Sequence, residues 1–83
     1  MAKRTIRCKP GEQRFTVLRV NGDNYDTHAG RSFEAARRAA QPDRGAKIDV
    51  FAVCAMDPGE ARMPAVYKNR GQGQLLRTFR VKR

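Results

Sequence analysis

The segment from Lys47 to Met56, K-I-D-V-F-A-V-C-A-M, is apolar on both faces of an extended chain except at Lys47 and Asp49. Side chains alternate between the two faces of a strand, so this pattern is typical of a central strand covered on one side by a helix. A chain of 83 residues buries only about 60–65% of the surface that it exposes when unfolded, so a single thin core is expected. The sequence therefore predicts one domain, residues 1–83, built around this strand.

One helix is predicted at residues 32–41, S-F-E-A-A-R-R-A-A-Q. Ser32 is a favourable N-cap, and Glu34 lies in the first turn, where the helix dipole favours negative charge. Pro42 cannot continue a helix and ends it. The apolar positions form a narrow stripe of mostly small residues, which lets the helix lie close to a sheet: Phe33, Ala36 and Ala40.

Further strands are predicted where β-branched and aromatic residues gather between turn signals: residues 4–8, 14–20, 24–29, 65–70 and 74–82. Asn21-Gly22 is the strongest of these signals, because both residues tolerate the positive φ of a tight hairpin. Lys9-Pro10-Gly11-Glu12 and Asp57-Pro58-Gly59-Glu60 are also predicted as turns. Runs of strands around a single helix indicate an α+β fold, with an antiparallel β-sheet, one short α-helix packed on one face and the approximate order βββαβββ.

The segment Gly71-Gln72-Gly73 is similar in composition to the glycine-rich loops that hold phosphates. Such loops need either G-x-x-x-x-G-K-[ST] or G-x-G-x-x-G before a helix, and this chain has neither the lysine nor the third glycine. The residues that follow predict a strand, so no helix N-terminus is there to receive a phosphate. We therefore predict a hairpin turn. In the strand after it, one face would carry Leu75, Phe79 and Val81, interrupted by Arg77, and the other face would begin with Leu76.

The residues that catalysis or metal binding would need are few and scattered. His28 is the one histidine, and no Ser or Cys is marked by its position as a nucleophile for it. The eight carboxylates show no spacing typical of a catalytic pair, and His28, Cys8 and Cys54 form no recognised metal-ligand spacing. We therefore expect a protein that is not an enzyme, with no cofactor, no metal and no small-molecule substrate.

Cys8 and Cys54 lie far apart in the sequence, without a C-x-x-C spacing. We expect two free thiols in a reducing compartment. A single disulfide between them is the alternative, because the sequence does not fix the distance between the two residues. No apolar run follows the charged start of the chain, so no signal peptide is predicted. The apolar stretch at residues 50–56 is far shorter than the roughly 20 residues that span a bilayer. The expected localisation is the cytoplasm, without membrane contact.

The net charge of +10 is larger than solubility needs, and a charge of this size indicates a negatively charged partner. Thirteen of the eighteen basic residues are Arg, which binds phosphate and carboxylate through paired hydrogen bonds and stacks on bases. No acidic residue follows Glu60, and the first twenty residues hold six basic residues against one acidic residue, Glu12. If the terminal strands are neighbours in the sheet, these charges form one stripe that could follow a phosphate backbone.

The candidate contact residues come from the two ends of the chain and from the helix. We predict that a partner is bound by these basic residues: Arg4, Arg7, Arg37, Arg38, Lys68, Arg70, Arg77, Arg80, Lys82 and Arg83. The alternative is that they only keep the sheet edges from pairing with other chains, but that role does not need a net charge of +10. The expected partner is a nucleoprotein complex, a nucleic acid or an acidic protein surface.

The hairpin-like segment R-F-T-V-L-R-V-N-G-D-N-Y-D-T-H-A is followed by S-F-E-A-A-R-R-A-A and a strand, over residues 14–56. This step from strands to an alanine-rich helix resembles the small single-domain accessory proteins of bacteriophages, anti-CRISPR proteins among them. The resemblance implies a non-catalytic inhibitor that docks on a machine of the host cytoplasm, such as a CRISPR surveillance complex, and it assigns no site residue. The positive charge departs from the acidic, DNA-mimicking members and suits acidic protein patches or guide RNA.

Two functional hypotheses follow from the sequence. The leading one is a small, basic, non-enzymatic binding protein that docks on a nucleic-acid-processing nucleoprotein complex and modulates it. The alternative is a direct DNA- or RNA-binding module, for example a ribosome-associated one, although no familiar module fits the sequence. A small hydrolase or nuclease that uses His28 is the least favoured class.

Overall fold

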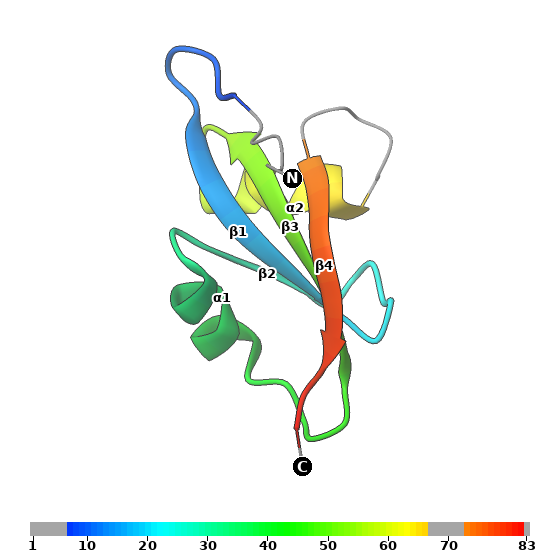
Figure 1. Cartoon of the computed structure of the whole chain (residues 1–83). Helices are drawn as coiled ribbons and strands as arrows, with labels where there is room; N and C mark the ends of the chain where they lie inside the picture. Colours follow the sequence, from blue (N-terminus) through cyan, green and yellow to red (C-terminus); the bar gives the residue numbers. More distant parts are fainter. Residues whose placement is uncertain (1–6, 67–72, 83) are drawn as a thin grey trace, which may run out of the picture.

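The computed structural model describes residues 7–66 and 73–82. Its elements follow one another in the order ββαβαβ (Figure 1): β1 Gln13–Val20, β2 Thr27–Gly30, α1 Phe33–Ala40, β3 Lys47–Ala55, α2 Pro58–Val66 and β4 Gly73–Arg80. The α+β class with an antiparallel sheet is confirmed, although a second helix was not predicted. None of the described helices is long and apolar enough to cross a membrane.

The described strands form one antiparallel sheet in the order β2-β1-β3-β4. β3 pairs with β1 along its length, from Ala55 opposite Gln13 to Ile48 opposite Val20, and with β4 on its other side. The prediction of a central strand at residues 47–56 is therefore confirmed. A continuous basic stripe from the two ends of the chain would require that β1 and β4 be neighbours. They are not, because β3 lies between them.

The chain turns back after β1 at the predicted hairpin signal. Asn21 and Gly22 have φ angles of 54° and 70°, and the Asp23 amide donates to the Val20 carbonyl at 2.9 Å. A second turn follows at once, because the Asp26 amide donates to the Asp23 carbonyl at 3.0 Å. The hairpin is confirmed, but its returning strand β2 begins only after this second turn and not at residue 24.

Helix α1 has the caps that its sequence predicts. The Ser32 hydroxyl accepts a hydrogen bond from the Ala35 amide at 3.1 Å, and Glu34 lies in the first turn. At the other end Gln41 has the left-handed conformation, with φ of 43°, and its amide donates to the Arg37 carbonyl. The predicted helix at residues 32–41 therefore agrees with the structure to within its two caps.

Helix α1 lies directly against β2, and Gly30 permits this close approach. A methyl group on the Cα of Gly30 would lie 2.4 Å from the Ala36 amide nitrogen and 2.8 Å from the Ala35 carbonyl carbon. These are backbone atoms, which cannot move aside as the end of a flexible side chain can. A larger residue at this position would therefore push the helix away from the sheet.

We expect Gly30→Ala to lower the free energy of unfolding by about 2–3 kcal/mol, as overpacking of a tight contact does. Urea unfolding of the variant and the parent would measure this loss. Gly59→Ala is the matched control, because a methyl group there would meet its nearest described neighbour, the Asp57 carboxylate, at 3.4 Å. Equal stabilities of the two variants would show that the contact of α1 with β2 can relax without loss.

The sheet carries a helix on each face, because β1 and β3 are apolar on both. Helix α2 covers the face of their odd-numbered residues in one buried cluster: Phe15, Val17, Phe51, Val53, Ala55 and Ala61. Helix α1 covers the face of their even-numbered residues in a second cluster: Leu18, Val20, Ala36, Ala46, Ile48 and Val50. In Figure 1, α1 lies beside β2 and α2 passes behind β3 and β4. The prediction of a helix on one face alone is thereby corrected.

Asp57-Pro58-Gly59-Glu60 begins helix α2 and does not form the predicted turn. The Asp57 carboxylate accepts a hydrogen bond from the Glu60 amide at 2.8 Å, and the Glu60 carboxylate accepts one from the Met56 amide at 2.7 Å. This is a capping arrangement, and Pro58 at the first helical position has no N–H to leave unpaired. The strand predicted at residues 65–70 is wrong over its first two residues, which end α2; its remaining residues lie outside the described part.

Strand β4 pairs with β3 along the described residues, and Gly73 is its first residue. The predicted hairpin around Gly71-Gln72-Gly73 therefore does not pair β4 with a strand at residues 65–66; Gly71 and Gln72 themselves lie outside the described residues. A hairpin turn was expected because glycines between extended segments usually join neighbours in a sheet. Here the segment before them is helical at its start, and β4 adds to the edge of β3.

A β-bulge in this pair changes which leucine faces the core. Val50 is opposite Arg77, whereas the next residue, Phe51, is opposite Leu75, so Leu76 is the inserted residue. As a consequence Leu76 joins the side chains packed against the α1 side of the sheet, and Leu75 is exposed. The prediction had placed Leu75, and not Leu76, on the face of Phe79 and Val81. It assumed strict alternation, which holds only where no residue is inserted.

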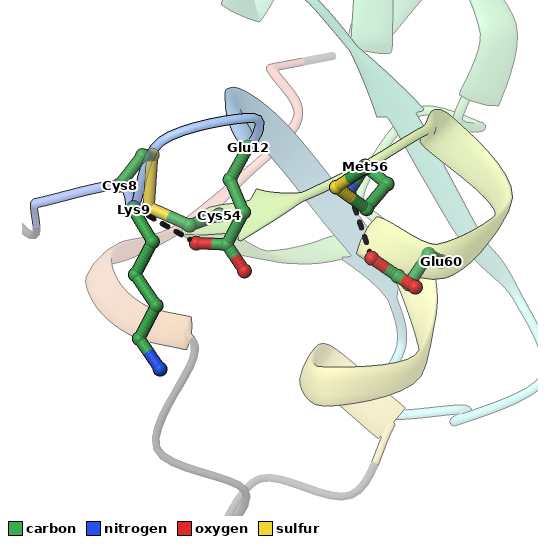
Figure 2. The surroundings of a disulfide bond; sticks show 6 residues. All are labelled: Cys8, Lys9, Glu12, Cys54, Met56 and Glu60. Carbon is green, nitrogen blue, oxygen red and sulfur yellow. Dashed lines mark hydrogen bonds between the residues drawn. A yellow bond between two sulfur atoms is a disulfide. The ribbon is translucent and has the colours of Figure 1, made fainter.

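Cys8 and Cys54 form a disulfide, so the expectation of free thiols was wrong (Figure 2). The predicted turn at residues 9–12 folds the chain back, with the Glu12 amide donating to the Lys9 carbonyl at 2.9 Å and the Lys9 amide to the Glu12 carboxylate at 3.0 Å. This brings the two cysteine Cα atoms to 5.2 Å, within the range of disulfides. Cys8 and Arg7 are not in a strand, which corrects the end of the strand predicted at residues 4–8; residues 4–6 lie outside the described part.

Candidate functional site

A groove of about 410 Å³ lies between helix α1 and the end of strand β4. Aromatic, aliphatic and basic side chains line it: Phe33, Arg37, Arg77, Phe79, Arg80, Val81 and Lys82. A second hollow of about 350 Å³ shares Phe33 and Arg37 with it and is also lined by Glu34 and Arg38. Basic residues from two segments that are far apart in the sequence therefore meet at one surface.

The local structure of each element explains why these side chains meet. Arg37 follows Phe33 by four residues on α1, which places both on the same side of the helix. Arg77 and Phe79 are two residues apart on β4, which places both on the face of the sheet that α1 covers. Beyond the strand, the Val81 amide donates to the Ala46 carbonyl at 2.9 Å and holds Val81 beside the loop that joins α1 to β3.

The guanidinium group of Arg77 lies over two aromatic rings. Its central carbon is 5.1 Å from the centroid of the Phe33 ring and 5.0 Å from that of Phe79. The ring centroids are 6.1 Å apart and the ring planes are tilted by 55°, so one cation contacts two rings that are inclined to each other. Both rings are half-buried, whereas Arg77 is exposed. Ring faces attract a cation, so these contacts restrict the conformations of the Arg77 side chain and leave its positive charge in place.

The remaining groove cations are exposed at its rim. Arg37 and Lys82 are exposed, and the Arg80 guanidinium donates through Nη1 to the Gly45 carbonyl at 3.0 Å. The carbonyl is a neutral acceptor, so this hydrogen bond does not neutralise the positive charge of Arg80. The one acidic side chain that lines either hollow is Glu34, among the described residues. The groove is therefore a positive surface with a partly aromatic floor.

The structure brings together five of the ten predicted contact residues and separates or leaves out the others. Arg37, Arg77, Arg80 and Lys82 line the groove, and Arg38 lines the hollow beside it. Arg7 lies next to the disulfide, at the end of β3 opposite to the end that pairs with Phe79. The other predicted residues lie outside the described part of the chain: Arg4, Lys68, Arg70 and Arg83.

Phe33 and Phe79 line the groove although neither was predicted as a contact residue. Both are partly buried against the α1-side cluster and also line the groove. The signal was their spacing to basic residues, because Arg37 shares a helix face with Phe33 and Arg77 shares a strand face with Phe79. On each of the two elements, an aromatic residue and an arginine share one face. Where these faces meet, a ring lies beside a cation.

A polar network lies on the opposite face of the sheet and was also missed. Arg19 donates to Asp49 Oδ2 through Nε at 3.0 Å and Nη2 at 2.8 Å, and Thr78 donates to Asp49 Oδ1 at 2.8 Å. The Asp49 side chain is only 6% exposed. Burial raises its pKa, but the hydrogen bonds from Arg19 and Thr78 and the charges of Arg19 and Lys47 together outweigh burial and lower the pKa below 3.8. The network joins β1, β3 and β4 in register.

His28, the candidate general base, lies on β2 with its Nε2 2.6 Å from Asp26 Oδ1. Both side chains belong to the hairpin between β1 and β2, and both are partly exposed. An Asp–His pair of this kind orients an imidazole, but a catalytic role needs a nucleophile or substrate in reach of its other nitrogen. In the described ranges, no group of three or more His, Cys, Asp or Glu side chains could hold a metal ion.

Comparison with known proteins finds no matching family model, and no curated protein or solved structure similar to this chain. The fold and the groove themselves define a small α+β protein with a basic, aromatic-floored groove at one edge of an antiparallel sheet.

Proposed function

We propose that this protein is a non-enzymatic binding protein that holds the phosphate backbone of a nucleic acid in the groove between α1 and β4. The observation that carries the proposal is the convergence of Arg37, Arg77, Arg80 and Lys82 on one groove. Basic residues bound to phosphates release condensed counterions, which supplies most of the affinity of such contacts. Arg also matches the geometry of phosphate oxygens with two parallel N–H donors.

The alternative role of these cations, protection of a sheet edge, accounts for fewer of them. Arg77 and Arg80 lie on the edge strand β4, but Arg37 is on a helix that packs on the sheet face. Edge protection gives no reason for a helix residue to share a groove with them. Binding of a negatively charged partner gives a reason for all three.

The nucleic acid could be free or part of a nucleoprotein complex, which the sequence analysis favoured as the partner. The groove supports contact with the nucleic-acid component of such a complex, such as a guide RNA, because its aromatic floor suits bases better than carboxylates. Docking on a CRISPR surveillance complex is one form of this proposal and stays a prediction. A pull-down from host lysate with and without nuclease distinguishes the two contacts, because a partner that survives nuclease treatment is bound through protein.

The direct test is the combined variant Arg77→Ala, Arg80→Ala and Lys82→Ala. We expect its affinity for nucleic acid near 0.15 M salt to fall roughly ten- to hundred-fold, with the slope of log K against log salt reduced by about 2–3, since two or three phosphate contacts are lost. Fluorescence anisotropy over a range of salt concentrations measures both quantities. Thermal unfolding confirms that the variant remains folded.

The matched control removes three cations elsewhere, through Arg7→Ala, Lys9→Ala and Arg14→Ala. All three residues are exposed and lie near the disulfide or on the strand that pairs with Cys54, away from the groove. The net charge changes by the same amount, so a general electrostatic effect would weaken both variants equally. Equal losses in the two variants would refute the groove as the binding site.

A further inference from the structure

The position of Arg77 indicates more than a positive charge. Its guanidinium carbon is almost equally far from the Phe33 and Phe79 ring centroids, at 5.1 and 5.0 Å, although the rings belong to different elements. A planar cation held in this way loses little further conformational freedom when it binds a ligand, which favours tight binding. Because Arg77 is exposed, the groove presents the planar, positively charged guanidinium group of this residue beside two rings.

An exposed guanidinium plane beside aromatic rings is a stacking surface for an unpaired base. Bases of a single strand stack on aromatic rings and on the planes of arginine side chains, and this stacking is independent of sequence. In a duplex the base faces are stacked on one another, and a protein reaches only base edges and phosphates. The stacked cluster of Phe33, Arg77 and Phe79 would therefore contribute nothing to the binding of a duplex.

The shape of the groove leads to the same ligand. Its volume of about 410 Å³ is that of a site for a small ligand and fits about one nucleotide unit. A duplex presents its phosphates along two ridges, separated by grooves about 12 Å and 6 Å wide, so contact with both ridges takes cations in two lines. Here Arg37, Arg80 and Lys82 instead surround one hollow, where consecutive phosphates of a single strand would pass.

We infer that the groove selects single-stranded nucleic acid, with one base stacked on the cluster of Phe33, Arg77 and Phe79 and the neighbouring phosphates on Arg37, Arg80 and Lys82. This inference rests on the proposed function and names its ligand class. Selection arises because stacking is added to phosphate contacts for an unpaired strand, whereas a duplex gains the phosphate contacts alone.

The test compares a labelled strand of about 16 nucleotides, the upper end of the site size of many single-strand-binding folds, with the same strand annealed to its complement. In fluorescence anisotropy near 0.15 M salt, we expect the single strand to bind at least roughly ten-fold tighter, the effect of one stacked base. Arg77→Lys keeps the charge and removes the plane, so it should reduce binding of the single strand roughly ten-fold and change duplex binding little.

Phe79→Leu is the second variant, because it removes a ring and keeps an apolar side chain for the partly buried position. It should weaken single-strand binding in the same way, without a change in the salt dependence. Equal affinity for the two ligands, or full single-strand affinity in Arg77→Lys, would overturn the inference and leave phosphate binding in place. Failure to bind either ligand would overturn both the inference and the proposed function.

Discussion

Arg19→Ala is expected to lower the free energy of unfolding by about 3 kcal/mol, because it leaves the Asp49 carboxylate buried without the cation that faces it. The Asp49 and Arg19 side chains are 6% and 17% exposed, so water cannot easily replace the lost hydrogen bonds. A loss of this size should lower the midpoint of thermal unfolding by roughly 12–24 °C in a domain of this size. Urea unfolding at neutral pH measures the free energy directly.

Two further variants separate the ion pair from a general effect of losing arginine. Arg14→Ala removes an exposed residue from the same strand and should change the stability by no more than about 0.5 kcal/mol. The double variant Arg19→Met and Asp49→Leu replaces the pair with apolar groups and should recover most of the loss, because no unpaired buried charge remains. If Arg19→Ala costs no more than Arg14→Ala, the pair does not stabilise the sheet.

The same pair should appear in the pH dependence of stability. The folded-state pKa of Asp49 is lowered below 3.8, so its contribution is fully present above that pH and is lost as the pH falls through the lower, folded value. The parent protein should therefore lose stability below about pH 3.8, and Arg19→Ala should lose less over the same range. A parallel acid dependence in both proteins would show that other carboxylates are responsible.

The elements that the sequence predicted well are those whose signals are local. Ser32, Glu34 and the proline after the helix define α1 within a single stretch of chain, and the apolar run of β3 needs no partner to be recognised. Helix α2 was missed because Asp-Pro-Gly-Glu is compatible both with a turn and with the start of a helix. The choice depends on whether Ala61 has a sheet face to pack on, which is a tertiary fact.

The site was predicted only in part, because its residues have local signals and their arrangement depends on the tertiary fold. Arg37, Arg77, Arg80 and Lys82 were predicted as contact residues, from the uneven distribution of charge along the chain and from the basic pair on the helix. Their meeting point was not, because it depends on the strand order β2-β1-β3-β4 and on α1 packing on the face of the sheet to which Arg77 and Phe79 belong. The bulge at Leu76 was equally invisible in the sequence, and it decides which side chains of β4 face the helix.

The disulfide leads to a prediction of similar size. Linking residues separated by 46 positions restricts the unfolded chain by about 4 kcal/mol in the chain-entropy model. Measured effects are often smaller, so reduction, or Cys8→Ser, should lower the free energy of unfolding by about 2–4 kcal/mol and the thermal midpoint by roughly 10–30 °C. Cys8→Ser is the better variant, because Cys54 is buried and a hydroxyl there would add a second cost.

Adding reductant to Cys8→Ser is the control, since no disulfide remains for it to break. The prediction would be contradicted if the parent protein unfolded at the same temperature with and without reductant, while alkylation showed that both of its thiols were reduced.

The state of the thiols in the cell also matters, because the predicted cytoplasmic localisation implies reduction and thus the less stable form. The groove lies at the other end of β3 from Cys54, so reduction should lower stability and leave nucleic-acid affinity unchanged while the protein stays folded.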